Sequence, residues 1–168
     1  MKRDATFSIR FGLHYDMHVG PGDTLPGTGI NVGYLEDIFR RLSVDFVQTD
    51  TKGHPGYTSW FSTSIPESVP DGLRVDQLEI WRAASRSLGL PMHCHYSGVY
   101  ERRAAELHPD WRVVSQSSEI PQDPNGQNAG APPDVVLCPR SPYLDEYMIP
   151  QLKELAESYE VDGFWIDG

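Results

Sequence analysis

Apolar residues along the chain recur with two alternating periods, which predict strands and helices in turn. In residues 6–15, "TFSIRFGLHY", apolar side chains recur at every second position from Phe7, as in a strand with one buried face. Residues 32–42, "VGYLEDIFRRL", instead follow the 3.6-residue period of an amphipathic helix. The alternation continues to the last residue, with further strands predicted over 44–50, 90–98 and 161–168 and helices over 73–88 and 141–159, where Pro150 should break or kink the helix.

This order of elements contains no hairpin signal, so it predicts a parallel sheet with right-handed crossovers. A doubly wound open sheet and a (β/α)8 barrel share that order. The loops after the strands are long and rich in His, Asp, Lys, Tyr and Trp, whereas the loops before the strands are short. That asymmetry favours the barrel, whose active site is built from the loops that follow the strands. A barrel needs eight units and roughly 250 residues, so we expect residues 1–168 to be the N-terminal half of an α/β TIM barrel, with the first four β/α units.

Composition restricts the partners. The net charge of −10 argues against nucleic acid and anionic membranes, because phosphate groups bind clustered Lys and Arg. No long apolar run and no signal-peptide h-region are present, so no membrane span is expected, and localisation stays open between cytoplasm and secretion with a removed leader. Residues 107–140, rich in Pro, Gly, Ser and Asn, predict a long loop excursion over the site. The unpaired edges of a half barrel also favour pairing with another chain, including a homo-oligomer.

Residues able to do chemistry gather where the predicted strands end. Alternation places Trp165 and Asp167 on one face of the last strand, an aromatic ring beside a carboxylate, as in sites for neutral sugars. A single histidine in a strand is more often structural, and we expect this for His18 and His93. The candidates are His14, Asp16 and His18 after the first strand, Asp50, Lys52, His54, Tyr57 and Trp60 after the second, His93, His95 and Tyr96 after the third, and Trp165 and Asp167 in the fourth.

Four of these segments resemble the α-L-fucosidase-like glycoside hydrolases and uncharacterised glycosyl-hydrolase-like barrels related to them. "RFGLHYDMHVG" is similar to the pattern R-F-G-L-F-x-H-W-G with its His displaced, and "HYS" is similar to Y-Y-S. "KGHPGY" resembles K-H-H-D-G-F, although Gly53 and Pro55 replace a His and an Asp and leave the sugar open. "VDGFWIDG" resembles D-x-L-W-F-D-G, in which the Asp before the final Gly is the nucleophile.

The resemblance implies a retaining glycosidase without metal or cofactor, in which Asp167 attacks the anomeric carbon. A second carboxylic acid, roughly 5–5.5 Å away, would act as acid and base. Glu101 and Glu119 are the only loop glutamates near that face, and in the family this residue lies beyond the fourth strand, so we expect the chain alone to be inactive. Lys52 and His54 would help keep Asp167 ionised. The residues expected to bind the carbohydrate are His14, Asp50, Lys52, His54, Tyr57, Trp60, His95, Tyr96 and Trp165.

Two alternatives remain open. A metal-dependent hydrolase would use the H-x-H pair His93 and His95, completed by Asp16, His54 and Asp167. A carbohydrate-binding barrel that has lost catalysis would keep the aromatic and polar residues without turning over a substrate.

Overall fold

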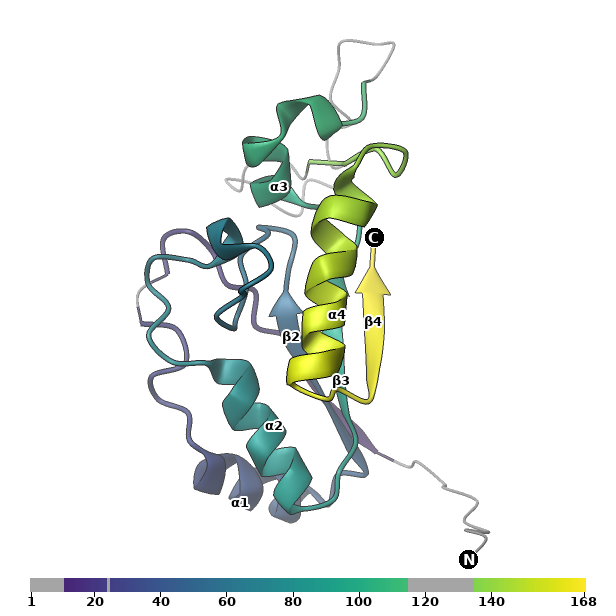
Figure 1. The fold of residues 1–168 in the computed structure, drawn as a ribbon. Coiled ribbons are helices and arrows are strands. Elements are labelled where there is room, and N and C mark those ends of the chain that lie inside the picture. Colours follow the sequence, from purple (N-terminus) through teal and green to yellow (C-terminus); the bar gives the residue numbers. More distant parts are fainter. Residues whose placement is uncertain (1–10, 24, 115–134) are drawn as a thin grey trace, which may run out of the picture.

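The computed structural model describes residues 11–23, 25–114 and 135–168, and a four-stranded sheet forms its centre. The strands follow one another across the sheet in chain order, each parallel to the next (Figure 1). This confirms the predicted parallel pairing. The start of the first predicted strand and residues 115–134 of the predicted excursion lie outside the described residues. The strands are β1 (Gly12–Tyr15), β2 (Phe46–Lys52), β3 (Met92–Ser97) and β4 (Gly163–Asp167).

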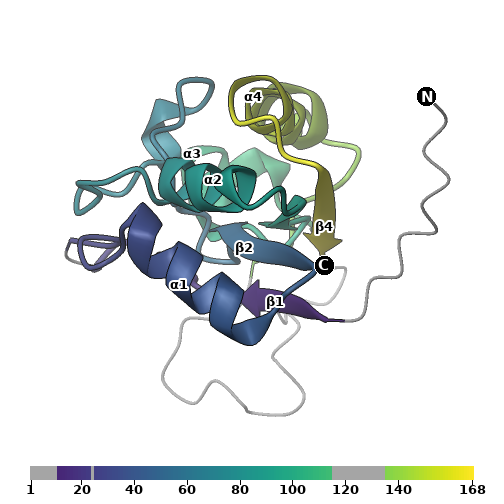
Figure 2. The same cartoon turned by 90° about the horizontal axis from the view of Figure 1, so that it is seen from below.

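The three longer helices lie on one side of the curved sheet, as Figure 2 shows. A doubly wound sheet would carry helices on both faces, so this arrangement confirms the (β/α)-barrel geometry over a doubly wound sheet. The opposite, concave face of the sheet is called the inner face below. The helices are α1 (Val32–Leu42), α2 (Gln77–Ser87), α3 (Arg102–Leu107) and α4 (Ile149–Ser158), with the 3-10 turns η1 (Pro66–Ser68) and η2 (Pro109–Trp111) and the π-helix η3 (Leu144–Met148).

Local chemistry explains where these helices differ from the predicted ranges. α2 begins at Gln77 rather than at residue 73, because the Asp76 side chain accepts a hydrogen bond from the Glu79 amide and caps the helix. The predicted helix over 141–159 is divided near Pro150, which has no N–H and would clash with the carbonyl one α-helical turn earlier. The wider π-helix η3 precedes it and closes with a hydrogen bond from the Ile149 amide to the Leu144 carbonyl.

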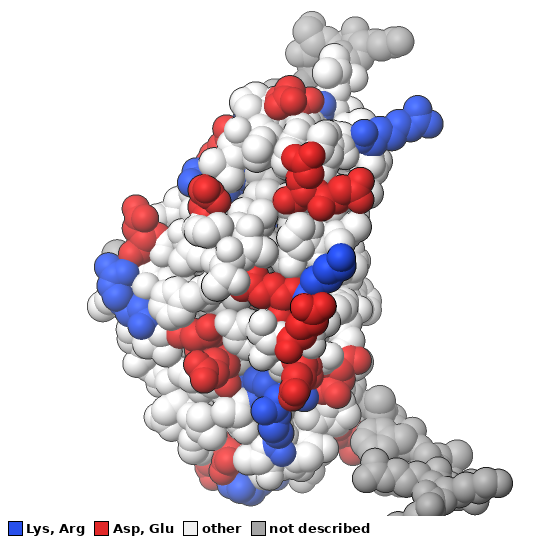
Figure 3. Space-filling view, viewed as in Figure 1, with Lys and Arg blue, Asp and Glu red and all other residues white. Residues whose placement is uncertain are grey.

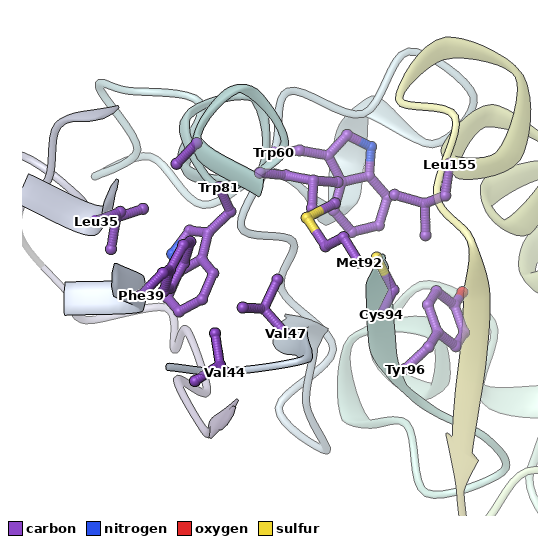
Figure 4. Close-up of a cluster of buried hydrophobic side chains, with 12 residues drawn as sticks. Leu35, Phe39, Val44, Val47, Trp60, Trp81, Met92, Cys94, Tyr96 and Leu155 are labelled. Carbon is purple, nitrogen blue, oxygen red and sulfur yellow. The ribbon is translucent and has the colours of Figure 1, made fainter. Parts of the chain in front are cut away.

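A hydrophobic core fills the space between the helices and the outer face of the sheet (Figure 4). Val47, Met92 and Cys94 contribute from the strands, and Trp81 contributes from α2. Trp60 belongs to this core and its side chain is fully buried. Trp60 is therefore a packing residue and not part of a substrate-binding surface, in contrast to the expectation from sequence.

A buried ion pair lies at the end of β2. The Lys52 ammonium contacts the Glu101 carboxylate, and both side chains are completely buried. The Lys52 Nζ atom also lies 4.1 Å from the centre of the Tyr96 ring and 5.0 Å from that of Tyr147. Gly56 permits this packing, since its φ is +85° and a Cβ there would overlap Glu101. Burial lowers the pKa of Lys52 and raises that of Glu101, and their mutual attraction opposes both shifts.

A register shift explains why Lys52 leaves the inner face. Asp50 pairs with His95, but after the irregularity Lys52 pairs with Tyr96 rather than with Ser97. Tyr96 belongs to the core beneath the helices, so Lys52 lies on that side as well. Lys52 is thus a structural cation, and the expectation that it binds substrate or keeps Asp167 ionised is corrected.

A second polar contact ties α4 to the loop after β2. The Glu154 carboxylate accepts hydrogen bonds from the Thr63 amide at 2.7 Å and hydroxyl at 2.9 Å, and from the Ser64 hydroxyl at 2.6 Å. The Ser62 hydroxyl donates a further bond at 3.0 Å. Partial burial raises the pKa of Glu154, but the hydrogen bonds from Ser64 and Thr63 outweigh it, so the pKa is lowered overall.

Replacing Glu154 by Gln should change the pH dependence of stability. The lowered pKa in the folded state means that Glu154 stabilises the fold above the ordinary pKa of 4.5, and that this contribution is lost as pH falls below it. At pH 7 we expect Glu154→Gln to reduce the free energy of unfolding by about 2 kcal/mol. Urea unfolding between about pH 7 and pH 3 should show the wild type losing more stability than the variant. The exposed Glu157 on the same helix gives the control Glu157→Gln, and equal pH profiles for all three proteins would contradict the contact.

Breaking the Lys52–Glu101 pair should destabilise the fold strongly. Lys52→Met leaves a buried carboxylate without a partner, and we expect a loss of about 3–5 kcal/mol in the free energy of unfolding. The double variant Lys52→Met/Glu101→Gln removes both charges and keeps an acceptor for the Ala104 amide, which Glu101 now caps. Chemical unfolding should therefore show the double variant more stable than Lys52→Met. Equal stability of the two variants would show that the charge pair is not formed.

Candidate active site

Histidine and aspartate side chains converge on the inner face where the strands end. Parallel strands carry their carboxyl ends to one edge of the sheet, so residues from all four strands meet there. The ring centres of His18 and His95 are 5.9 Å apart and nearly parallel, and that of His18 lies 5.8 Å from that of His54. The group comprises His14, Asp16 and His18 of β1 and its following loop, Asp50 and His54 of β2 and its following loop, His95 of β3 and Asp167 of β4. We call these residues the imidazole cluster.

Asp167 presents its carboxylate to two of these imidazoles. Its Oδ2 atom lies 3.4 Å from His95 Nε2 and 3.8 Å from His54 Nε2, and about half of the side chain is exposed. The other ring nitrogen of His54, Nδ1, is 2.8 Å from the Ser97 hydroxyl, which orients the ring. Trp165 is opposite His95 in the β3–β4 register, and 60% of the residue is exposed. A carboxylate, two imidazoles and an open indole ring thus share one edge of the sheet.

His95 links Asp167 to a buried aspartate. Its Nδ1 atom contacts the Asp50 Oδ1 atom, and the Asp50 side chain has no exposed surface. The hydrogen bond to Asp50 raises the pKa of His95, burial opposes this, and Asp167 adds to the rise. The charged imidazolium is therefore favoured between the two carboxylates. Asp50 cannot contact a substrate from this position, so its expected binding role is corrected to one behind His95.

His18 enters the site through a space that Gly53 leaves. A Cβ atom at Gly53 would overlap the His18 ring, so only glycine accommodates the imidazole here. The His18 Nε2 atom lies 3.1 Å from Asp16 Oδ1 and 3.3 Å from Asp50 Oδ2. The structural role expected for His18 from sequence is thus replaced by a place in the cluster. The only sign of this in the sequence is Gly53, which has no side chain. That sign can be interpreted only when the contact between Gly53 and His18, in the loop after β1, is known.

The remaining candidates divide between the site and the packing around it. His14 is exposed on the inner face, with Nδ1 3.0 Å from the Gln48 amide nitrogen. Tyr96 is fully buried and donates its hydroxyl to Gln151, so it packs in the core and does not contact substrate. The guanidinium carbon of Arg103 lies 5.5 Å from the centre of the Tyr57 ring.

Of the two glutamates considered as acid and base, the structure describes Glu101 alone. Glu101 is buried against Lys52, and Glu119 lies outside the described residues. Glu101 therefore does not supply a carboxylic acid beside Asp167.

One group of possible metal ligands occurs in the described part of the chain. Ligand atoms of His18, Asp50 and His95 all lie within 4.8 Å of one another. The set proposed from sequence does not gather in this way, because His93 lies elsewhere on β3 with its ring 5.4 Å from that of Phe46.

Charged side chains of both signs occur on one face of the molecule. On the face seen in Figure 3, acidic side chains are spread over the surface with basic ones between them, and no continuous basic area is visible there. In the described ranges, no helix has both the length and the apolar character to cross a bilayer.

Comparisons with known proteins identify a matching family and similar solved structures. The family model of hypothetical glycosyl hydrolase 6 (GHL6) matches residues 34–168. The structure is similar to α-L-fucosidase isoenzyme 2 from Paenibacillus thiaminolyticus, with a TM-score of 0.79 and 19% identity over 94% of this chain and 23% of that one. An α-fucosidase from Thermotoga maritima gives a TM-score of 0.58 and 20% identity over 83% of this chain and 29% of that one. Comparison with curated proteins gives no match.

A hypothetical protein from Ruminiclostridium thermocellum is also similar, with a TM-score of 0.66 and 15% identity over 92% of this chain and 75% of that one. The chain spans about a quarter of the length of the two fucosidases. At these identities the likeness establishes the fold, that of the first β/α units of a TIM barrel. Because the family model covers most of the chain, the protein belongs to the hypothetical glycosyl hydrolase 6 family.

Proposed function

We propose that the protein is a retaining glycoside hydrolase and that Asp167 is its nucleophile. The observation that carries this proposal is the position of the Asp167 carboxylate, which is accessible at the strand ends while His95 and His54 approach the same oxygen. A nucleophilic carboxylate must stay ionised near neutral pH. The contacts with Asp50 and Asp167 raise the pKa of His95, so a positive imidazolium lies 3.4 Å from the Asp167 oxygen.

The same edge of the sheet offers groups suited to a sugar. Trp165 provides an exposed ring on which the apolar face of a sugar can stack. It precedes the proposed nucleophile by two residues in β4, so both side chains lie on the same face. His14 and His54 offer ring nitrogens to sugar hydroxyls, and both side chains are accessible to different degrees. The described residues here are neutral or able to switch between neutral and charged forms, apart from the carboxylates. Such a surface fits a carbohydrate better than an anionic ligand.

In this proposal, the second carboxylic acid comes from a part of the full-length protein outside residues 1–168. Retaining enzymes place it roughly 5–5.5 Å from the nucleophile, where it protonates the leaving oxygen and later activates water. Glu101 cannot serve, since it is buried and paired with Lys52. By the resemblance to fucosidase-like enzymes this acid lies beyond the fourth strand, so we expect residues 1–168 by themselves to be inactive, and the activity to belong to the full-length protein.

The structural neighbours suggest the first substrate to test. Two of them are named as fucosidases, so aryl α-L-fucosides are the natural starting probe. Gly53 and Pro55 differ from the fucosidase pattern, so a panel of aryl glycosides should accompany them.

Asp167→Gly in the full-length protein should abolish hydrolysis while leaving the fold intact. The side chain is half exposed, so its loss leaves no buried cavity. We expect kcat to fall by roughly 1,000-fold or more, as for other removed nucleophiles. Sodium azide should partly restore turnover of an activated aryl glycoside and form a glycosyl azide, because the small anion can replace the missing carboxylate.

A matched variant, Asp71→Gly, removes an exposed loop aspartate and should keep full activity. Full activity in Asp167→Gly would exclude the nucleophile assignment. Sugar binding without any product from the wild type would instead indicate a carbohydrate-binding barrel that has lost catalysis.

A further inference from the structure

We infer that His18, Asp50 and His95 form a binding site for one divalent first-row transition-metal ion, with Zn²⁺ as the reference ion. This site lies within the imidazole cluster and goes beyond the glycosidase proposal, since metal binding does not depend on hydrolysis. Two imidazoles and one carboxylate are a frequent ligand set for zinc and for non-haem iron.

The spacing between His18 and Asp50 fits a shared ion. One atom from each of the three residues lies within 4.8 Å of the other two. The His18 Nε2 atom and the Asp50 Oδ2 atom are 3.3 Å apart. Two ligands that each bind zinc at about 2.0–2.1 Å in tetrahedral geometry are separated by roughly 3.3 Å.

A buried oxygen without a donor points to the same position. The Asp50 side chain is fully buried, and its Oδ2 atom receives no hydrogen bond although His18 Nε2 is 3.3 Å away. Leaving a buried carboxylate oxygen unpaired is costly, so a cation or proton is expected beside it. Within the described residues, every ion pair made by Asp16, Asp50 and Asp167 is with an imidazole. Three carboxylates thus share only titratable cations, and a divalent ion would balance them.

The second ring nitrogen of His95 has the kind of partner that metal-bound histidines usually have. A metal-bound histidine usually donates its other ring N–H to a carboxylate, which fixes its tautomer. His95 Nε2 lies 3.4 Å from Asp167 Oδ2, while Nδ1 lies against Asp50. To bind an ion together, Nδ1 and Asp50 must move apart, and the proton that they share is released to solvent. Nε2–H then remains directed at Asp167, so the ion orients the imidazole beside the proposed nucleophile.

The test is zinc binding by the full-length protein. After removal of metals with EDTA, isothermal titration with ZnCl₂ should show one equivalent bound with micromolar or tighter affinity. Asp50→Asn and His18→Gln should each weaken binding by at least about 100-fold, the upper range for loss of an outer-shell partner. His93→Gln is the matched control, because His93 is on the same strand but outside the group, and it should bind like the wild type. Co²⁺ substitution should give a visible spectrum that is lost in His18→Gln.

The outcomes separate this inference from the proposed activity. Asp167→Gly keeps all three ligands, so it should lose hydrolysis and still bind Zn²⁺. His18 is partly exposed, so its variant remains informative if Asp50→Asn fails to fold by circular dichroism. No zinc binding by the wild type, or equal binding by the wild type and His18→Gln, would overturn the site whatever the hydrolytic activity.

Discussion

The register shift in β2 determines which charges reach the inner face of the sheet. Asp50 remains in regular pairing with His95. After the shift, Lys52 pairs with Tyr96, so it does not occupy the next position on the inner face. The ammonium is thereby enclosed with Glu101 and aromatic rings. The carboxylates left on the inner face are balanced by imidazoles in the described residues. All further chemistry at this edge depends on that distribution.

Imidazoles are suited to this role because their charge can change near neutral pH. His95 contacts a buried carboxylate through one nitrogen and faces an accessible carboxylate through the other. Asp50 thus orients the ring, and the ring directs its second nitrogen at Asp167. The buried Asp50 Oδ2 atom receives no hydrogen bond and lies 3.3 Å from His18 Nε2, at the position proposed for the cation. The proposed nucleophile and the proposed cation thus belong to one cluster.

Much of the fold follows from local sequence patterns. Strand and helix periods predicted the four parallel strands, and the residues at the strand ends indicated one common edge. Alternation along the last strand placed Trp165 and Asp167 together, since β4 is regular over its length. The resemblance to glycosyl-hydrolase-like barrels agrees with the family that the family model identifies, and the fold is similar to that of fucosidases.

What the sequence could not predict depends on interactions between distant segments. Alternation assumes regular pairing, so the shift that encloses Lys52 has no local sign. Trp60 and Tyr96 carry ring chemistry suited to a sugar site, and only the packing of α4 and its neighbours shows them to be core residues. His18 joins the cluster because Gly53, over thirty positions later in the chain, leaves space for its ring.

The central claim is that Asp167 forms a covalent bond with the sugar. Its most direct test is peptide mass spectrometry of the full-length protein after reaction with a 2-deoxy-2-fluoro-glycosyl fluoride of a sugar that it hydrolyses. The fluorine slows breakdown of the glycosyl-enzyme, so the adduct accumulates. The account predicts one added sugar on the peptide that contains Asp167 and none in Asp167→Gly. An adduct on a different carboxylate, or the same labelling in Asp167→Gly, would contradict it.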